Sequence, residues 1–431
     1  MDTKELEDYD YHYGLKEESR RKDRPRHAKN SFEYRRGNID LRYDEGTSAR
    51  DIIVNRRLFR VWHPEARGDK TLTERLTSLS RYPDVFPYVA IMPDYHNGES
   101  SVNGSVIPSE NLLYINAIGG DIGCGMSFAR LPLTTHDLGD KLRKIYEAIY
   151  QKVPTGRRVN IEDYEKFSDF PLFQQELEVL NKGNIKDALQ QIGTLGGGNH
   201  FIEVQADSED NIAVMIHTGS RAIGQHIRTI FMRKATNPEK SRNLFYLSAD
   251  SKEGKEYLEH VDFATRYAAE NRAEILRRVM EAFSEQFPEL RECLSEDNII
   301  DVPHNFISLE NYFGKEVYVH RKGAIHVPKD SFGAVPGSMG SASYVVRGRG
   351  NKYSFDSCSH GAGRRMSRGQ AFDLIRREEF IGAMGDVISR TDDSIVDEAP
   401  QAYKDINEII KYQKDLIRTT DKLRPLASIK G

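Results

Sequence analysis

Segments of strand type and segments of helix type follow one another in this chain of 431 residues without regular alternation. Short apolar runs that are typical of strands lie at residues 88–92, 101–108, 112–116, 126–133, 202–204, 213–216, 299–302, 317–320 and 342–347. Apolar residues recur with helical spacing over residues 138–151, 162–191, 264–287, 370–380 and 402–423. A doubly wound sheet needs strands and helices to alternate, so this order favours an α+β fold with mixed or antiparallel sheets and flanking helices.

The composition divides the chain into a charged N-terminal extension and one large domain. Residues 1–50 carry dense charges of both signs and few aliphatic side chains, so we expect a mobile, solvated tail rather than an RNA-binding arm. Residues 51–431 form the expected domain, in which the charged, helix-rich stretch around residues 225–295 has the character of a helical insertion. The formal net charge of −4 means that any site for a polyanion must be a local basic patch.

The cysteines and the apolar runs bear on the cellular compartment. Three cysteines, Cys124, Cys293 and Cys358, are odd in number and widely spaced, which is not the pattern of a disulfide framework. The sequence has neither a cationic and apolar leader at its start nor an apolar run approaching about 18 residues. We therefore expect a soluble, cytoplasmic protein.

The strongest chemical signal is a glycine-flanked segment that places Asp121 and Cys124 three residues apart. His200, His217 and His304 lie at the ends of expected strands or in glycine-rich turns, where binding residues concentrate. Each histidine alone is more often a structural residue, and a lone cysteine is as often a small buried hydrophobe. Their joint occurrence favours a metal site. Carboxylate, imidazole and thiolate together suit Mn, Co, Fe or Zn better than Mg.

Two glycine-rich loops and a histidine flanked by arginines indicate phosphate binding. Residues 193–199 and 336–343 expose backbone amides that can bind phosphate oxygens, although each loop alone is also typical of a tight turn. His360 precedes a capping box formed by Ser367 and Gln370, so a helix should begin there, among arginines. A histidine so placed can be a nucleophile, a general acid or base, or an anion contact. The pattern favours metal-assisted phosphoryl chemistry.

Several long strings, in this order, give the chain a family resemblance from about residue 92 to residue 431. They begin with Met92-Pro93-Asp94 and continue at residues 104–108, 121–126, 199–203, 217–221, 321–324, 336–340, 359–364, 397–406 and 429–431. Together they resemble RtcB, the family of GTP-dependent RNA ligases. The resemblance departs from the common pattern at Tyr95-His96-Asn97-Gly98 and at Gly119-Gly120. Neither departure removes one of the candidate ligands named above.

The resemblance implies specific roles for the residues that match its motifs. Two Mn²⁺ ions would be held by Asp121, Cys124, His200, His217 and His304, with the Cys124 thiolate bridging them. His360 would take GMP from GTP as a covalent phosphoramidate. Contacts to the guanylate would fall on Asn199, His200, Phe201, Ile202, Glu203, His304, Asn305, Pro336, Gly337, Ser338, Met339, Ser343, His360, Gly361, Ala362, Gly363, Tyr403 and Lys430. Candidates for binding RNA phosphates, in or beside the matched strings, are Arg221, Lys322, Arg364 and Arg368.

The implied reaction joins an RNA 3′-phosphate or 2′,3′-cyclic phosphate end to a 5′-hydroxyl end, in tRNA splicing or RNA repair. The resemblance also suggests a monomer and an archease-type activating partner. Two alternatives remain open at this point. One is an enzyme that guanylylates the RNA 3′ end without sealing it, and the other is a non-catalytic protein that binds RNA or stores metal.

Overall fold

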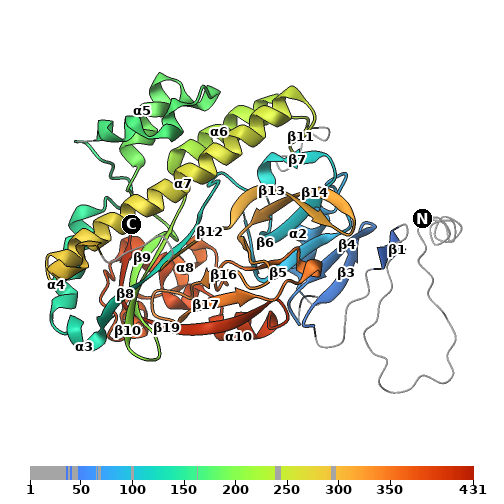
Figure 1. The fold of residues 1–431 in the computed structure, drawn as a ribbon. Coiled ribbons are helices and arrows are strands. Elements are labelled where there is room, and N and C mark those ends of the chain that lie inside the picture. The colour runs from blue at the N-terminus through green and yellow to red at the C-terminus, as the bar shows by residue number, and fades with distance from the viewer. Residues whose placement is uncertain are drawn as a thin grey trace, which may run out of the picture.

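The computed structural model describes residues 35–36, 39–40, 47–64, 66, 69–98, 101–162, 164–237, 244–292 and 298–431. The extension expected over residues 1–50 falls mostly outside these ranges, and so does Cys293. The described chain combines helices with two large sheets, one antiparallel and one mixed, which confirms the expected α+β fold (Figure 1). Within these ranges, no helix has both the length and the apolar character needed to cross a membrane.

The larger sheet has seven strands, and every neighbouring pair in it is antiparallel. In spatial order these strands are β12 (Ile299–Pro303), β8 (Gly125–Thr134), β10 (Asn211–Thr218), β9 (Phe201–Ala206), β19 (Ile417–Lys430), β17 (Ser343–Gly348) and β16 (Phe332–Val335). Side chains alternate along β10, so Val214 and Ile216 pack in one hydrophobic cluster and Ala213 and Met215 in another. His217 shares the face of Met215.

A layer of helices covers the face of this sheet that carries Val214 and Ile216 (Figure 1). The helices on this side of the molecule are α3 (Thr135–Leu138), α4 (Lys141–Lys152), α5 (Lys182–Gln191), α6 (Arg221–Lys234) and α7 (Lys252–Ser284). Ile275, Val279 and Phe283 of α7 pack with residues of α4 and of the sheet in one buried cluster. His217, on the opposite face, therefore points away from the helices.

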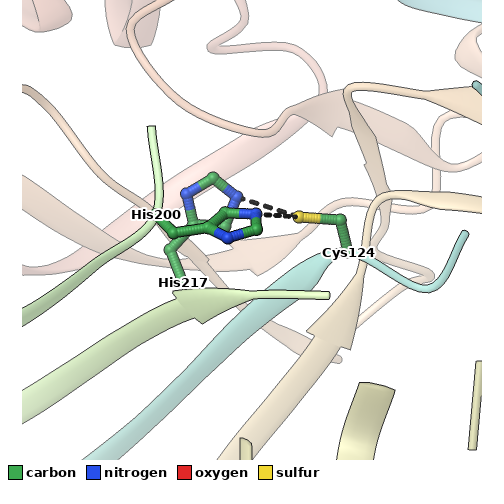
Figure 2. Close-up of side chains that lie close together, drawn as sticks. All are labelled: Cys124, His200 and His217. Atoms are coloured by element: carbon green, nitrogen blue, oxygen red, sulfur yellow. Dashed lines mark hydrogen bonds between the residues drawn. The ribbon is translucent and has the colours of Figure 1, made fainter. Parts of the chain in front are cut away.

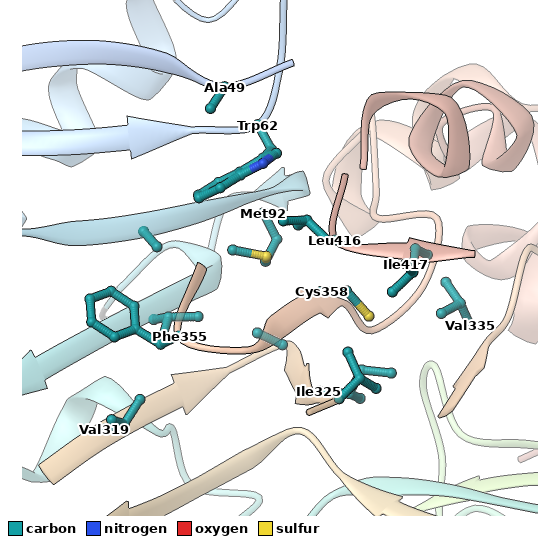
Figure 3. Close-up of a cluster of buried hydrophobic side chains, with 14 of the residues drawn as sticks. Ala49, Trp62, Met92, Val319, Ile325, Val335, Phe355, Cys358, Leu416 and Ile417 are labelled. Carbon is teal, nitrogen blue, oxygen red and sulfur yellow. The ribbon is translucent and has the colours of Figure 1, made fainter. Parts of the chain in front are cut away.

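The second large sheet has six strands and is parallel only between β4 and β5. Its order is β13 (Asn305–Tyr312), β14 (Lys315–Lys322), β6 (Asn103–Ser109), β5 (Val89–His96), β4 (Arg57–Val61) and β3 (Arg50–Val54). On one side, α2 (Lys70–Leu79) packs its leucines against strand residues. On the other side, Trp62 and Met92 join Phe355 and Ile417 from C-terminal segments in a buried cluster (Figure 3).

Smaller elements complete the described chain. Three two-stranded sheets pair β1 (Arg35–Arg36) with β2 (Ile39–Asp40), β7 (Leu112–Tyr114) with β11 (Tyr246–Ser248), and β15 (Ala324–His326) with β18 (Ser357–Ser359). The last three helices are α8 (Arg368–Leu374), α9 (Arg377–Met384) and α10 (Ile406–Tyr412). The side chain of Ser367 accepts a hydrogen bond from the backbone N–H of Gln370, so the capping box expected before α8 is confirmed.

Three of the expected helices differ from the structure. The helix expected over residues 370–380 is divided into α8 and α9, because Ile375 and Arg376 are not helical. The helix expected over residues 402–423 is limited to α10, and the chain from Ile417 onwards forms β19. This strand pairs with β17 on one side and β9 on the other, and these pairings override the helical spacing of its residues. Residues 162–191 form short 3₁₀ turns before α5, and Pro171, which lacks a backbone N–H, begins one of them.

Two strand predictions also require correction. The sequence also predicts that the strands at residues 101–108 and 112–116 pair with each other around a turn, but β6 pairs with β5 and β14 while β7 pairs with β11. The strand expected to stop before Pro93 continues to His96 as β5.

Candidate active site and metal centre

The loop that carries Asp121 and Cys124 packs closely against α7. Gly123 in this loop has a φ of 75°, and a Cβ there would lie 2.7 Å from the Cα of Thr265. Only glycine fits such a position. The buried guanidinium of Arg272 in α7 donates to the carbonyl oxygen of Gly123 at 2.9 Å. The close backbone approach indicated by the glycines is confirmed, and α7 fixes the loop in place.

Three of the candidate metal ligands, Cys124, His200 and His217, lie together near the start of β8 and the end of β10 (Figure 2). The Cys124 Sγ lies 3.5 Å from the Nε2 of His200 and 3.2 Å from the Nε2 of His217. The Oδ2 of Asp121 lies 3.0 Å from the same His200 nitrogen. The ring of His304 packs edge-on against that of His217, with 5.1 Å between centroids. All five residues named from the sequence therefore meet in one cluster.

The backbone selects the tautomer of two of these histidines. The Nδ1 of His200 lies 2.9 Å from the carbonyl oxygen of Leu195, and the Nδ1 of His217 lies 3.1 Å from that of Asn199. A carbonyl only accepts, so each Nδ1 carries the proton and each Nε2 of a neutral ring presents a lone pair. These lone pairs face sulfur and carboxylate oxygen. A cation between them satisfies all of these groups, and such outer hydrogen bonds are typical of histidine ligands.

Burial and charge in the cluster also fit a bound cation. Burial lowers the pKa of His217 and His304 well below the ordinary value, so both rings are neutral. Burial raises the pKa of Asp121, but its hydrogen-bonding and charged neighbours, Arg221 among them, together more than offset it and hold that pKa below its ordinary value. Within the described chain, Asp121 Oδ1 and His304 Nδ1 are buried without a hydrogen-bond partner. These atoms and the donor set fit one or more transition-metal ions.

His360 lies beside this cluster, on the loop after β18. Its ring packs against His304 at 4.7 Å between centroids. Its Nδ1 lies 2.6 Å from an oxygen of Asp94, a fully buried residue of β5, and its backbone N–H donates to the same oxygen at 3.2 Å. This carboxylate holds the proton on Nδ1 and leaves the lone pair of a neutral ring on Nε2. A Cβ at Gly363 would lie 2.1 Å from the carbonyl oxygen of Asp94, so glycine is required for this approach.

A cavity of about 1050 Å³ opens at His360 and contains most of the residues expected to contact a guanylate. Of that set, its lining includes Asn199, Phe201, Glu203, Pro336, Gly337, Ser338, Met339, His360, Gly361, Ala362, Gly363, Tyr403 and Lys430. His217 lines it as well and connects the cavity to the metal cluster. The structure therefore brings residues from both large sheets to one space.

The other expected guanylate contacts lie behind this lining. His200 and His304 belong to the cluster of candidate metal ligands. Ser343 is buried below the cavity lining, and its Oγ accepts a hydrogen bond from the Nε2 of Gln205 at 3.1 Å. The side chain of Ile202 packs in the cluster on the helical face of the sheet. Asn305 connects the Asp121 loop to the turn after β14, because its amide donates to the Asp121 carbonyl oxygen at 3.0 Å.

The four cations expected to bind RNA phosphates separate into two pairs. Arg364 and Arg368 line the cavity. Arg221 lies behind it, with its Nε 3.3 Å from the Oγ1 of Thr194. Lys322 is buried, and its Nζ lies 3.5 Å from the carbonyl oxygen of Ser101. The structure thus places two of the four directly at the cavity.

A buried carboxylate that the sequence did not single out holds several cavity residues together. Glu398, with 1% of its side chain exposed, accepts hydrogen bonds from Lys430 at 2.8 Å, Tyr403 at 2.5 Å and Arg364 at 3.0 Å. Burial raises the pKa of Glu398, but the charge and hydrogen bond of Lys430, together with the contacts to Tyr403 and Arg364, outweigh it and lower that pKa to about 2. We call these four residues the Glu398 clamp. Its signal in the sequence was the matched string at residues 397–406.

Comparison with known proteins agrees with this geometry. The family model described as tRNA-splicing ligase RtcB matches residues 75–431. The chain belongs to the RtcB family. An RNA-splicing ligase RtcB of Escherichia coli K12 is 35% identical over 402 residues, which cover 86% of this chain and 97% of that protein. A tRNA-splicing ligase RtcB of Methanococcus maripaludis is 28% identical and covers 83% of this chain and 91% of its own length.

Family membership confirms the resemblance on which the site residues were chosen. Asp94 was part of that resemblance, in the string Met92-Pro93-Asp94, but no role was predicted for it. Its pairing with His360 joins residues 266 positions apart, which no local sequence pattern reveals.

Proposed function

We propose that this protein is an RNA ligase that joins a 3′-phosphate or 2′,3′-cyclic phosphate end to a 5′-hydroxyl end, using GTP and two Mn²⁺ ions. The observation that carries the proposal is the position of His360. Its Nδ1 is held by Asp94, and its ring touches the candidate metal cluster at the wall of a cavity large enough for a nucleotide. Membership of the RtcB family supports an RNA substrate.

Asp121, Cys124, His200, His217 and His304 would hold the Mn²⁺ ions. Bound metal would supply Lewis-acid stabilisation of negative charge on phosphate oxygens. The neutral imidazoles of His217 and His304 and the ionised carboxylate of Asp121 suit this role because none of them needs to lose a proton on binding.

His360 would be the nucleophile of the first step. Its Nε2 attacks the α-phosphorus of GTP, a P–N bond forms, and the bond to the leaving pyrophosphate breaks. The positive charge that develops on the ring is stabilised by Asp94, which accepts from Nδ1. The GMP then passes to an oxygen of the RNA 3′-phosphate, and the P–N bond breaks. A cyclic end would first be opened by water.

In the last step, the 5′-hydroxyl oxygen attacks the activated 3′-phosphate. A new phosphodiester forms, GMP leaves, and the hydroxyl proton is lost to a base or to solvent. We propose that Arg364 and Arg368, at the cavity, hold the RNA 3′-phosphate, and that Arg221 and Lys322 assist from behind it. The proposal extends to a cytoplasmic monomer assisted by an archease-type partner.

Covalent labelling tests the proposal. The protein is incubated with Mn²⁺ and α-³²P-labelled GTP, and label that survives denaturation but is released by mild acid is measured. We expect Mn²⁺-dependent label in the native protein and none in His360→Ala. His136→Ala, which alters an exposed histidine on α3, is the matched control and should label normally. Label that persists in His360→Ala would place the nucleophile elsewhere.

Sealing of RNA separates the proposed function from its alternatives. Sealed product from 3′-phosphate and 5′-hydroxyl strands is expected. A guanylylated 3′ end that accumulates beside an available 5′-hydroxyl strand would instead support the capping alternative.

A further inference from the structure

The cavity continues beyond the guanylate residues to the second large sheet. This part, which we call the α2 arm, is lined by His63, Asp69, Arg75, Tyr95, His96 and Asn97. They come from the start of α2, the end of β5 and the segment before α2. Two of them, His63 and Asp69, precede residue 75, where the family match begins.

His360 lies between the two parts of the cavity. On one side, a Cβ at Gly361 would lie 3.2 Å from the carbonyl oxygen of Pro336, a member of the guanylate set, and the His360 ring touches His304. On the other side, the ring of His96 is stacked on that of His360, with 6.1 Å between centroids and 19° between planes. The reacting phosphorus, which is next to His360, would therefore have one arm of the cavity on each side.

In-line displacement decides which group must occupy the α2 arm. The attacking and leaving oxygens lie on opposite sides of the phosphorus in phosphoryl transfer. When the RNA strands are joined, GMP leaves into the guanylate residues. The attacking 5′-hydroxyl must then approach from the opposite side, which is the side of the α2 arm.

The charges of the two sides favour the same assignment. The guanylate side carries Arg364 and Arg368, which are proposed above to hold the terminal 3′-phosphate with its full charge. In the α2 arm, both carboxylate oxygens of Asp69 accept hydrogen bonds from the protein. One accepts from the backbone N–H of Leu72 at 2.9 Å and so caps α2, and the other accepts from the hydroxyl of Tyr95 at 2.9 Å. A strand that ends in an uncharged hydroxyl fits this less cationic space.

His96 is also neutral by its hydrogen bonds. Its Nδ1 lies 3.0 Å from the carbonyl oxygen of Asp94 and therefore carries the proton, while its Nε2 lies 3.0 Å from the amide nitrogen of Asn103 and accepts. It presents a flat, uncharged ring beside the nucleophile. Such a ring suits a nucleoside rather than a phosphate.

Arg75 is the cation of the α2 arm that remains available to a ligand. Its Nε donates to the Oδ1 of Asn97 at 3.2 Å, which fixes the guanidinium plane, and it forms no ion pair within the described chain. The other cation nearby, Lys404, donates to the carbonyl oxygens of Tyr95 at 2.5 Å and Pro93 at 3.3 Å. Arg75 can therefore bind the first phosphate that follows a 5′-terminal nucleoside.

We propose that the α2 arm is the binding site for the RNA strand that carries the 5′-hydroxyl, with Arg75 on its first internucleotide phosphate. This inference rests on the proposed ligase function. It separates the two RNA ends by position: the 3′-phosphate strand lies on the side of Arg364 and Arg368, and the 5′-hydroxyl strand lies on the side of α2.

The test compares Arg75→Ala with Glu74→Ala, an exposed residue one position earlier on α2 that does not line the cavity. Fluorescent oligoribonucleotides, one with a 5′-hydroxyl and a blocked 3′ end and one with a 3′-phosphate, are titrated with each protein without GTP. We expect Arg75→Ala to weaken binding of the 5′-hydroxyl strand about tenfold and to lower its salt dependence by about one phosphate contact. Binding of the 3′-phosphate strand and both titrations of Glu74→Ala should match the native protein.

Turnover gives a second readout. With Arg75→Ala, the protein–GMP label and the guanylylated RNA 3′ end should form as in the native protein, because neither needs the 5′-hydroxyl strand. The KM for that strand should rise about tenfold, and Arg75→Lys should recover part of the loss. Equal weakening of both strands, or unchanged binding of the 5′-hydroxyl strand, would overturn the inference. Absence of GMP label in the native protein would instead contradict the proposed function, and the binding titrations would still test the α2 arm.

Discussion

Replacing Glu398 by glutamine tests whether the Glu398 clamp holds the cavity wall in place. The carboxylate is buried and accepts from Lys430, Tyr403 and Arg364. Glutamine keeps the shape of the side chain but removes the negative charge and one acceptor. Two cations are then left without their buried counter-charge, which is among the costlier changes that a single substitution can make.

The pKa of Glu398 gives the size of the effect. A tenfold change in proton affinity corresponds to about 1.4 kcal/mol, so a pKa that falls from 4.5 to about 2 on folding is worth about 3 kcal/mol. The folded-state pKa is the lower one, so this stability is complete well above pH 4.5 and is lost as the pH falls through 2. At pH 3 the unfolded carboxyl is protonated and the folded one is still ionised, and only about 1.4 kcal/mol remains.

Urea unfolding of Glu398→Gln and of the native protein at pH 7 and at pH 3 measures this quantity. We expect the variant to be less stable by about 3 kcal/mol at pH 7, and the difference to shrink by about 2 kcal/mol at pH 3. Glu378→Gln, an exposed residue of α9, is the control and should change stability by less than about 0.5 kcal/mol at either pH.

The variant should also bind GTP more weakly, because Tyr403 and Lys430 lose the group that positions them at the cavity. A difference in stability that is the same at both pH values would refute the reasoning. In that case the carboxylate would not be ionised by its partners, and the clamp would be an ordinary set of hydrogen bonds.

Three further substitutions test other parts of the site. In Asp94→Asn, the amide can present an N–H to His360 Nδ1, which favours the tautomer with the proton on Nε2. We expect the rate of labelling with GMP to fall by roughly 10²- to 10⁴-fold. An unchanged rate would contradict the role of Asp94. Loss of a residue that only hydrogen-bonds to a metal ligand lowers metal affinity roughly 10- to 100-fold, and Cys124→Ala should lower Mn²⁺ affinity by more than this. The measurement is the Mn content of the protein after dialysis, and retained Mn would exclude Cys124 as a ligand. Burial raises the pKa of Glu203 to about 7, so ionisation of this carboxyl opposes folding at pH values above its ordinary pKa of 4.5. In urea unfolding, Glu203→Gln should therefore add about 3 kcal/mol of stability at pH 8 and none below pH 4.5. The same substitution should weaken GTP binding.

The sequence predicted the metal cluster because its members have uncommon chemistry in uncommon places. His217 lies at the end of an apolar run typical of a buried strand, and Cys124 lies between two glycines. Both patterns can be recognised in the sequence without knowledge of the fold. The alternation along β10 then explains the geometry: Met215 and His217 share the face that the helices leave uncovered. The alternation of side chains along a strand and the types of residue were sufficient to predict this cluster of side chains.

Helical spacing was a weaker guide at the C-terminus. The segment from Ile417 has apolar residues at positions that suit a helix, yet it forms the strand that joins β9 to β17. Its conformation is fixed by two partners that are distant in sequence, and this pairing is not visible in the segment itself. Lys430, at the end of this strand, reaches the cavity only because the segment is extended.

Residues that hold other side chains in position were harder to predict from the sequence than residues that are expected to bind a ligand directly. Asp94 and Glu398 are carboxylates, which are common on any protein surface, and the matched strings that contain them gave neither residue a role. Each acquires its role through partners on separate elements: Asp94 on β5 holds His360 after β18, and Glu398 holds Lys430 at the end of β19. The position of His360 thus depends on contact between the six-stranded sheet and the loop after β18, and the position of Lys430 in the cavity wall depends on the end of the seven-stranded sheet. Because the reacting groups are divided in this way, the packing of the two sheets against each other, rather than any single strand or loop, sets the geometry of the site.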